Sequence, residues 1–163
     1  MKSPIVLIGP MGVGKTTIGK KLAKALDLNF VDTDAIITKR DGSIPKIFET
    51  QGEDFFRVRE SEALKLALTE GGVVATGGGI ILRQENREEL KNAFVIYLET
   101  DGRHIAARLV AGKRPLIKNG AEDWKRIYEQ RKPLYESSCD LKISTNGKTL
   151  SKVVAEIVEI RNG

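Results

Sequence analysis

The sequence predicts an α/β fold in which a parallel sheet is covered by helices on both faces. Short apolar runs alternate with longer segments of helical periodicity along the chain, which is the order that parallel βαβ units produce. A glycine-rich phosphate-binding motif also lies between the first apolar run and the first helical segment. Ligands of open parallel sheets bind at the carboxyl ends of the strands. We therefore expect the functional residues at that edge.

Five short apolar runs predict the strands of this sheet. Each is rich in branched or aromatic residues and is short enough for one strand. The runs are PIVLI (4–8), NFVDT (29–33), GVVAT (72–76), AFVIYL (93–98) and DLKIS (140–144). Because they are separated by helical segments, the strands are expected to pair in parallel.

Segments with apolar residues every three or four positions predict the helices. The first such segment, 15–26, places Ile18, Leu22, Ala25 and Leu26 on one stripe, and similar patterns cover 53–69, 101–110, 122–136 and 148–161. The chain of 163 residues shows no repeat, low-complexity tract or linker. We therefore expect a single domain over residues 1–163.

Composition argues against several classes of function. No apolar run approaches the roughly 20 residues of a membrane-spanning helix, so no membrane partner is expected. The net charge of +5 suits anionic ligands, but basic residues are dispersed and aromatic residues are only 6% of the chain, which argues against a nucleic-acid surface. Cys139 is the single cysteine, which favours a reducing, cytoplasmic location.

The most informative stretch is GPMGVGKTT, residues 9–17. Gly9, Gly14, Lys15 and Thr16 fill the pattern GxxxxGK[ST] between a strand and a helix. Glycines let backbone N–H groups surround phosphates at the positive end of the helix. Lys15 is expected to reach the β and γ phosphates, and the Thr16 hydroxyl to bind Mg²⁺. The stretch predicts a nucleoside triphosphate site but leaves open whether the protein is a switch, a motor or a kinase.

Two further stretches place acidic and glycine residues at the ends of predicted strands. Asp32 and Asp34 follow the second strand, and if the chain stays extended both point to the same side. One carboxylate could then hold the water shell of a metal and the other could accept a hydroxyl proton, although Asp also often caps a helix. Gly77, Gly78 and Gly79 follow the third strand and permit close approach to a ligand, with a plain loop as the alternative.

The segment GEDFFRVRE carries two arginines on a predicted amphipathic helix. Arg57 and Arg59 cannot share one face of that helix. We expect one of them in a substrate site, where its planar fork suits a carboxylate, and the other in solvent.

The motifs GPMGVGKTT, DTD, FRVRE, TGGG, KRPL and QRKPLY occur in this order and together resemble those of shikimate kinases, a P-loop family similar to nucleoside monophosphate kinases. The P-loop is shared with many unrelated proteins, whereas the six motifs together are specific and span nearly the whole chain. The resemblance implies a three-layer α/β/α P-loop kinase fold with a five-stranded parallel sheet. It also implies a shikimate-binding region at about 33–60 and a mobile lid at about 109–123.

The implied reaction transfers the γ-phosphoryl group of ATP to the 3-hydroxyl of shikimate, giving shikimate 3-phosphate and ADP for the synthesis of chorismate and aromatic amino acids. The implied catalytic residues are Lys15, Asp34 and Arg114. The implied shikimate-binding residues are Asp34, Arg57, Gly77, Gly78, Gly79 and Arg131. The implied ATP-binding residues are Gly12, Val13, Gly14, Lys15, Thr16, Thr17, Arg108, Arg114 and Lys148. Thr16 and Asp32 are the implied Mg²⁺ residues, and the resemblance also implies a monomer.

Some features depart from this pattern or leave alternatives open. STNGKTLSKVV (144–154) has Lys148 but no proline, whereas the family often closes an arginine- and proline-containing loop around adenine. Asp34 either abstracts the hydroxyl proton or only orients the hydroxyl. His104 is expected on the surface, and Trp124 and Cys139 in packing. The alternatives are another kinase of this architecture, such as a gluconate or nucleoside monophosphate kinase, a non-catalytic relative, or a nucleic-acid-binding module.

Overall fold

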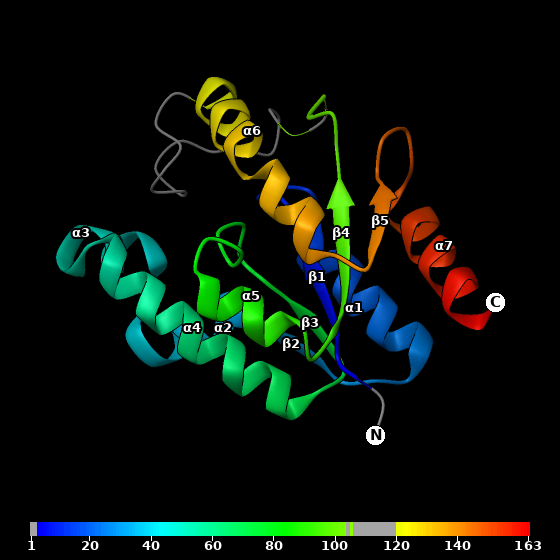
Figure 1. Ribbon diagram of the computed structural model, residues 1–163, viewed down its shortest axis with the longest axis horizontal. Helices are drawn as coiled ribbons and strands as arrows, with labels where there is room; N and C mark the ends of the chain where they lie inside the picture. Colours follow the sequence, from blue (N-terminus) through cyan, green and yellow to red (C-terminus); the bar gives the residue numbers. More distant parts are fainter. Residues whose placement is uncertain (1–2, 104, 106–119) are drawn as a thin grey trace.

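A five-stranded parallel sheet forms the centre of the molecule (Figure 1). The computed structural model describes residues 3–103, 105 and 120–163. The strands lie in the order β2-β3-β1-β4-β5, and every neighbouring pair is parallel. Their bounds are β1 Ile5–Ile8, β2 Phe30–Asp32, β3 Val73–Ala75, β4 Phe94–Glu99 and β5 Leu141–Ser144. All five predicted strands are thus present, each within about one residue of its apolar run.

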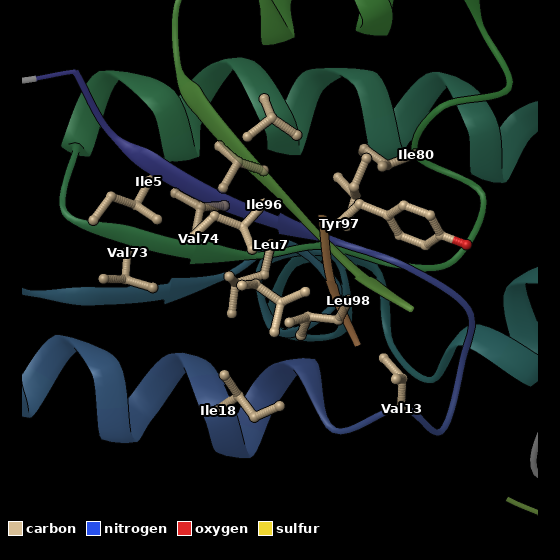
Figure 2. Packing of buried hydrophobic residues seen from close by; sticks show 14 of the residues in the cluster. Ile5, Leu7, Val13, Ile18, Val73, Val74, Ile80, Ile96, Tyr97 and Leu98 are labelled. Carbon is tan, nitrogen blue, oxygen red and sulfur yellow. The ribbon is translucent and has the colours of Figure 1, made fainter. Parts of the chain in front are cut away.

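Helices cover both faces of the sheet. Their bounds are α1 Lys15–Leu26, α2 Thr33–Asp41, α3 Ile44–Gln51, α4 Glu53–Glu70, α5 Gln84–Leu90, α6 Ala121–Ser138 and α7 Leu150–Asn162. Ile18 of α1 lies on one side of the sheet, and Tyr97 of β4 points to the other side (Figure 2). There Tyr97 stacks on Tyr135 of α6. Among the described helices α7 packs beside α1, so the predicted three-layer architecture is confirmed.

The sheet forms the core because its strands are apolar on both faces. The four side chains of β1 are all at most 1% exposed, and β3 and most of β4 are also buried. Burial of each such side chain contributes about 1.5–3 kcal/mol. The rigid centre fixes where each strand ends, and with it the loops that follow.

The helices differ from the prediction at one predicted segment and at three further helices. The predicted helix 101–110 is wrong at its start, because Asp101 to Arg103 form a bend and a turn, and Asp101 accepts a hydrogen bond from Arg103 N. The rest of that segment, with His104, lies outside the described residues apart from Ile105. Of the predicted lid, 109–119 also lies outside them, while residues 121–123 begin α6. Helices α2, α3 and α5 were not predicted.

The strand order brings three predicted motifs together. The P-loop follows β1, the Asp pair begins at the last residue of β2, and the three glycines follow β3. Because β2, β3 and β1 are consecutive in the sheet, their carboxyl ends meet at one edge. This adjacency places the acidic residues and the glycines beside the phosphate-binding loop.

Candidate active site

The P-loop has the backbone of a phosphate cradle. Gly9 and Gly14 have φ values of 149° and 104°, which side-chain-bearing residues rarely adopt. A Cβ on Gly9 would also lie 2.7 Å from the Leu98 carbonyl oxygen. The sequence therefore needs glycine here to bring the loop against β4 and to begin α1 directly at Lys15.

Lys15 lies folded back across this loop. Its side chain is buried, and its Nζ donates hydrogen bonds to the carbonyl oxygens of Gly9 at 2.6 Å and Pro10 at 2.8 Å. These contacts place a positive charge beside the loop amides. A phosphate bound there would meet both the lysine and the positive end of α1.

Thr16 and Asp32 connect the P-loop to β2. The Thr16 hydroxyl donates a hydrogen bond of 2.9 Å to Asp32 Oδ2. The other oxygen, Oδ1, accepts hydrogen bonds from the backbone N–H groups of Asp34 at 2.9 Å and Ala35 at 3.4 Å. Asp32 thus caps the N-terminus of α2 and also binds the Thr16 hydroxyl. From the sequence alone, helix capping is the alternative to a role near the metal.

The extended arrangement predicted for the Asp pair is wrong. Asp32 is the last residue of β2, but Thr33 already begins α2, because the Asp32 side chain caps the free N–H groups of that helix. Asp34 consequently lies in the first helical turn rather than two residues further along a strand. The two carboxylates separate, Asp32 toward Thr16 and Asp34 into the cavity described below.

Asp34 has the surroundings of a carboxyl group with a raised pKa. Burial raises its pKa to about 6, and the nearby carboxylates of Glu60 and Asp32 add to this effect, while Lys15 and Arg57 oppose it. Its Oδ1 is buried and has no hydrogen-bond partner within the described part of the chain. Such an oxygen can accept a hydrogen bond from a ligand hydroxyl at little cost.

Arg57 is the buried arginine of α4. Its Nε and Nη2 donate to Glu53 Oε2 at 3.2 and 3.1 Å, and its Nη1 donates to Glu60 Oε1 at 2.9 Å. Arg59, by contrast, has a side chain 32% exposed and pairs with Asp41 and Glu62. Only Arg57 is thus buried, as expected, whereas Arg59 is half-buried rather than fully in solvent; a substrate contact of Arg57 stays a prediction.

Glu60 is buried between the two predicted carboxylate-binding arginines. It is 1% exposed, and burial raises its pKa, whereas the neighbouring charges of Arg57 and Arg131 lower it. Arg131, on α6, is also buried. Sequence reasoning gave Glu60 no role, although its position three residues after Arg57 is the spacing of an ion pair on one helical face.

The three glycines lie among these charged groups. A Cβ on Gly77 would lie 3.0 Å from Asp34 Oδ1 and 3.1 Å from Glu60 Oε2, and one on Gly78 would lie 3.4 Å from Arg131 Nη1. A Cβ on Gly79 would collide with the Arg57 guanidinium. Glycine at these positions leaves the charged side chains where they are, so the loop after β3 can approach a ligand closely.

The P-loop, Asp34 and the first two of the three glycines line a cavity of about 450 Å³. Its lining joins the P-loop to Asp34 and the glycine loop and comprises Met11, Gly12, Gly14, Lys15, Thr16, Thr17, Asp34, Thr76, Gly77, Gly78 and Leu150. That volume is sufficient for a small molecule. A phosphate cradle at one end therefore opens onto a polar, charged recess at the other.

A smaller cavity of about 150 Å³ lies at the carboxyl ends of β4 and β5. It is lined by Val13, Thr100, Ile105, Thr145, Asn146, Lys148 and Leu150. Leu150 lines both cavities, so they adjoin. Lys148 lines this cavity, and its Nζ forms an ion pair of 2.9 Å with Glu156; its contact with ATP stays a prediction. Because the Lys148 ammonium is paired with Glu156, a flat ring in this cavity would contact mainly the apolar side chains of Val13, Ile105 and Leu150.

The remaining predicted residues have separate outcomes. Arg108 and Arg114 lie outside the described residues. Trp124 is a packing residue as expected, and its Nε1 also donates to the Met11 carbonyl oxygen at 2.8 Å. Cys139 packs against the core. In the described ranges, no group of three or more His, Cys, Asp or Glu residues could hold a metal by itself, and no helix is long and apolar enough to span a membrane.

Comparison with known proteins agrees with this geometry. The family model described as shikimate kinase matches residues 11–161. The chain belongs to the shikimate kinase family. A shikimate kinase of Alkaliphilus oremlandii is 42% identical over 97% of this chain and 98% of that protein, and one of Clostridium botulinum is 42% identical over 98% of each.

Solved structures of the shikimate kinase family share the fold. A shikimate kinase from Acinetobacter baumannii, in complex with shikimate, superposes with a TM-score of 0.93 at 36% identity and covers 99% of this chain and 93% of that one. The α/β fold with its five-stranded parallel sheet is thus that of a P-loop kinase. The family membership also makes the chain an ATP-dependent kinase of small molecules.

Proposed function

We propose that this protein transfers the γ-phosphoryl group of ATP to the 3-hydroxyl of shikimate, giving shikimate 3-phosphate and ADP on the route to chorismate and aromatic amino acids. The observation that carries the proposal is the position of Arg57 and Arg131. Both are buried and both lower the pKa of Glu60, and Arg131 lies beside Gly78, which lines the cavity, while Arg57 lies beside the next residue, Gly79. A compact carboxylate substrate is what two buried guanidinium groups suit best.

In this proposal the carboxylate of shikimate binds Arg57 and Arg131, while backbone N–H groups of Gly77 to Gly79 add contacts. The ring hydroxyls then face Asp34, whose Oδ1 has no other partner among the described residues. Asp34 orients the reacting hydroxyl and accepts its proton as the bond to phosphorus forms. Its raised pKa brings the carboxyl group closer to the acidity that proton transfer near neutral pH requires.

The P-loop supplies the phosphate site. Residues 12–17 would bind the ATP phosphates, with Lys15 next to the transferred group, and the recess near Lys148 would hold adenine. Phosphoryl transfer passes through a loose transition state, so positioning and neutralisation of charge supply most of the rate. Arg114 and Arg108 remain predictions from the family resemblance and lie outside the described residues.

The donor set at the P-loop fits Mg²⁺. The Thr16 hydroxyl uses its proton in the bond to Asp32, which leaves its oxygen lone pairs for a cation. Mg²⁺ usually binds one or two protein groups together with substrate phosphates and waters, so a full protein cage is unnecessary. We propose Thr16 as the direct ligand and Asp32 as the residue that holds a metal-bound water. Mg²⁺ bound there would neutralise charge on the phosphates.

We further propose that the enzyme works as a monomer in the cytoplasm. All described residues that line the two cavities come from one chain, which supports a monomer. The single cysteine suits a reducing compartment.

An acceptor panel tests the proposed function. Purified enzyme with Mg·ATP is assayed for ADP release with shikimate, gluconate or a nucleoside monophosphate, and the phosphorylated position is read by NMR. We expect turnover with shikimate alone and phosphate on its 3-oxygen. Turnover with gluconate or a nucleotide in place of shikimate would refute the proposal and favour another kinase of the same fold.

A further inference from the structure

The hydroxyl of Tyr135 joins two groups of the proposed carboxylate site. Tyr135 is fully buried on α6, one turn after Arg131. Its hydroxyl donates a hydrogen bond of 2.5 Å to the Gly78 carbonyl oxygen. The same hydroxyl accepts a hydrogen bond from the Arg131 guanidinium. One oxygen atom thus holds the glycine loop and the arginine in a fixed relation.

The bond to Gly78 also sets the direction of the next amide. In a trans peptide the C=O and the following N–H point to opposite sides. Because the Gly78 C=O points to Tyr135, the Gly79 N–H points away from it. Within the described residues this N–H has no hydrogen-bond partner, and Gly79 lies against the Arg57 guanidinium. A free donor is therefore presented beside one of the two arginines.

The position of the hydroxyl is itself fixed by packing. The Tyr135 ring stacks on Tyr97 of β4 with centroids 5.2 Å apart and planes at 24°. Tyr128 packs against it with centroids 6.1 Å apart. Burial raises the pKa of Tyr135 above its ordinary value, so the hydroxyl keeps its proton and remains a donor at physiological pH.

We propose that Tyr135 is a positioning residue for the substrate carboxylate. Its hydroxyl turns the Gly79 N–H toward the carboxylate and holds Arg131 beside it, while it does not contact the substrate itself. The inference rests on the proposed function, because it assigns a task at the same site. Tyr135 belongs to the aromatic core and does not line the cavity, yet we expect it to determine the affinity for the carboxylate.

Tyr135→Phe tests this inference because it removes one oxygen atom and keeps the stacked ring. Tyr97→Phe is the matched control. It removes a buried hydroxyl from the same aromatic cluster, where Tyr97 bonds to Tyr128 at 2.6 Å and not to the site. Both variants are first compared with wild type for thermal stability. The dissociation constant for shikimate is then measured by calorimetry, and kcat and both KM values by ADP release.

We expect Tyr135→Phe to weaken shikimate binding about tenfold, because the Gly78 carbonyl and Arg131 lose a buried partner. The KM for ATP and the kcat should stay within about twofold, and Tyr97→Phe should match wild type in all three. The dissociation constant for the methyl ester of shikimate is measured as a second test. The ester lacks the negative charge, so Tyr135→Phe and wild type should bind it equally.

Three outcomes would overturn the inference. They are unchanged shikimate affinity in Tyr135→Phe, an equal loss for the ester and for shikimate, and an equal loss in Tyr97→Phe. Failure of the proposed function is recognised separately, because the wild-type enzyme would then show no turnover with shikimate.

Discussion

Thr16 Oγ1 donates a hydrogen bond of 2.9 Å to Asp32 Oδ2 and so joins the start of α1 to the last residue of β2. Helix α1 follows β1, and β3 separates β1 from β2 in the sheet, so the bond links segments that belong to two non-neighbouring strands. The hydrogen bond uses the hydroxyl proton of Thr16, so the lone pairs of its oxygen remain available to a cation. The pair therefore couples the proposed metal ligand to the carboxylate that also caps α2.

The first prediction concerns this pair. Asp32→Asn should raise the Mg²⁺ concentration required for half-maximal turnover by about 10- to 100-fold, since an outer partner of a metal ligand is lost. Thr16→Val should raise it at least as much, whereas Thr16→Ser keeps the hydroxyl and should restore most of the Mg²⁺ affinity. The measurement is a Mg²⁺ titration of ADP release at saturating ATP. Equal titrations for wild type, Asp32→Asn and Thr16→Val would remove both residues from the metal site.

The second prediction is a pH dependence of activity through Asp34. Its pKa is about 6 in the ligand-free protein, and the proposed role requires the ionised form. The kcat/KM for shikimate should therefore fall about tenfold per pH unit as the pH drops below about 6. Asp34→Asn should lower kcat by about 10²- to 10⁴-fold and abolish that acidic limb. An acidic limb that persists in Asp34→Asn would assign the titration to another group.

The same carboxyl group predicts a dependence of stability on pH. The folded pKa lies above the ordinary value of 3.8, so ionised Asp34 destabilises the folded state. The penalty is absent below about pH 4, grows as the pH rises, and is complete above about pH 6, where it reaches at most about 3 kcal/mol. Asp34→Asn should thus unfold at higher urea than wild type at pH 8, and the gain should shrink toward pH 4. A gain that is independent of pH would contradict this assignment.

The third prediction separates stability from binding at Arg57. Arg57→Ala should abolish shikimate binding and cost about 3 kcal/mol of unfolding free energy, because the Glu60 carboxylate, 1% exposed, loses a direct partner. Adding Glu60→Gln removes the stranded charge. The double variant should regain most of the stability in urea unfolding but none of the shikimate affinity. If it regained affinity as well, the loss in Arg57→Ala would reflect misfolding rather than a missing ligand contact.

The fourth prediction concerns the close contact of Gly79 with Arg57. Gly79 does not have a positive φ, so alanine fits the backbone there, but its Cβ would displace the guanidinium. That group ends a flexible side chain and can move at modest cost. Gly79→Ala should therefore fold normally and lose at least about tenfold in shikimate affinity, with the KM for ATP unchanged. Loss of ATP affinity to the same degree would show a general distortion of the loop instead.

The strands and the P-loop could be predicted because their sequence signals are local. The run IVLI is apolar at every position, so its residues are expected in the core, and all four are buried there. Helix α5 shows the opposite case, since QENREEL is almost wholly polar and buries only Asn86 and Leu90. Asn86 is held there by a hydrogen bond to the Ile80 carbonyl oxygen, a contact that only the folded loop creates.

The site could be predicted only as far as motifs mark it. Asp34, Arg57 and the glycines carry recognisable patterns, whereas the tasks of Glu60 and Tyr135 arise from contacts between elements. Tyr135 meets Gly78 across 57 residues of sequence, and no periodicity encodes that meeting. The error at the Asp pair has a similar cause, because the chain turns into α2 where the Asp32 side chain accepts hydrogen bonds from the backbone N–H groups of Asp34 and Ala35.

The most direct test of the central claim is ADP release from Mg·ATP with and without shikimate. It is run on wild type, Arg57→Ala and Arg59→Ala, with folding checked for each. Arg59 is the matched control, since it lies on the same helix but is half-buried and pairs with Asp41 and Glu62. We predict shikimate-dependent turnover that Arg59→Ala retains and Arg57→Ala loses. No stimulation by shikimate in a wild-type protein that binds ATP would contradict the claim.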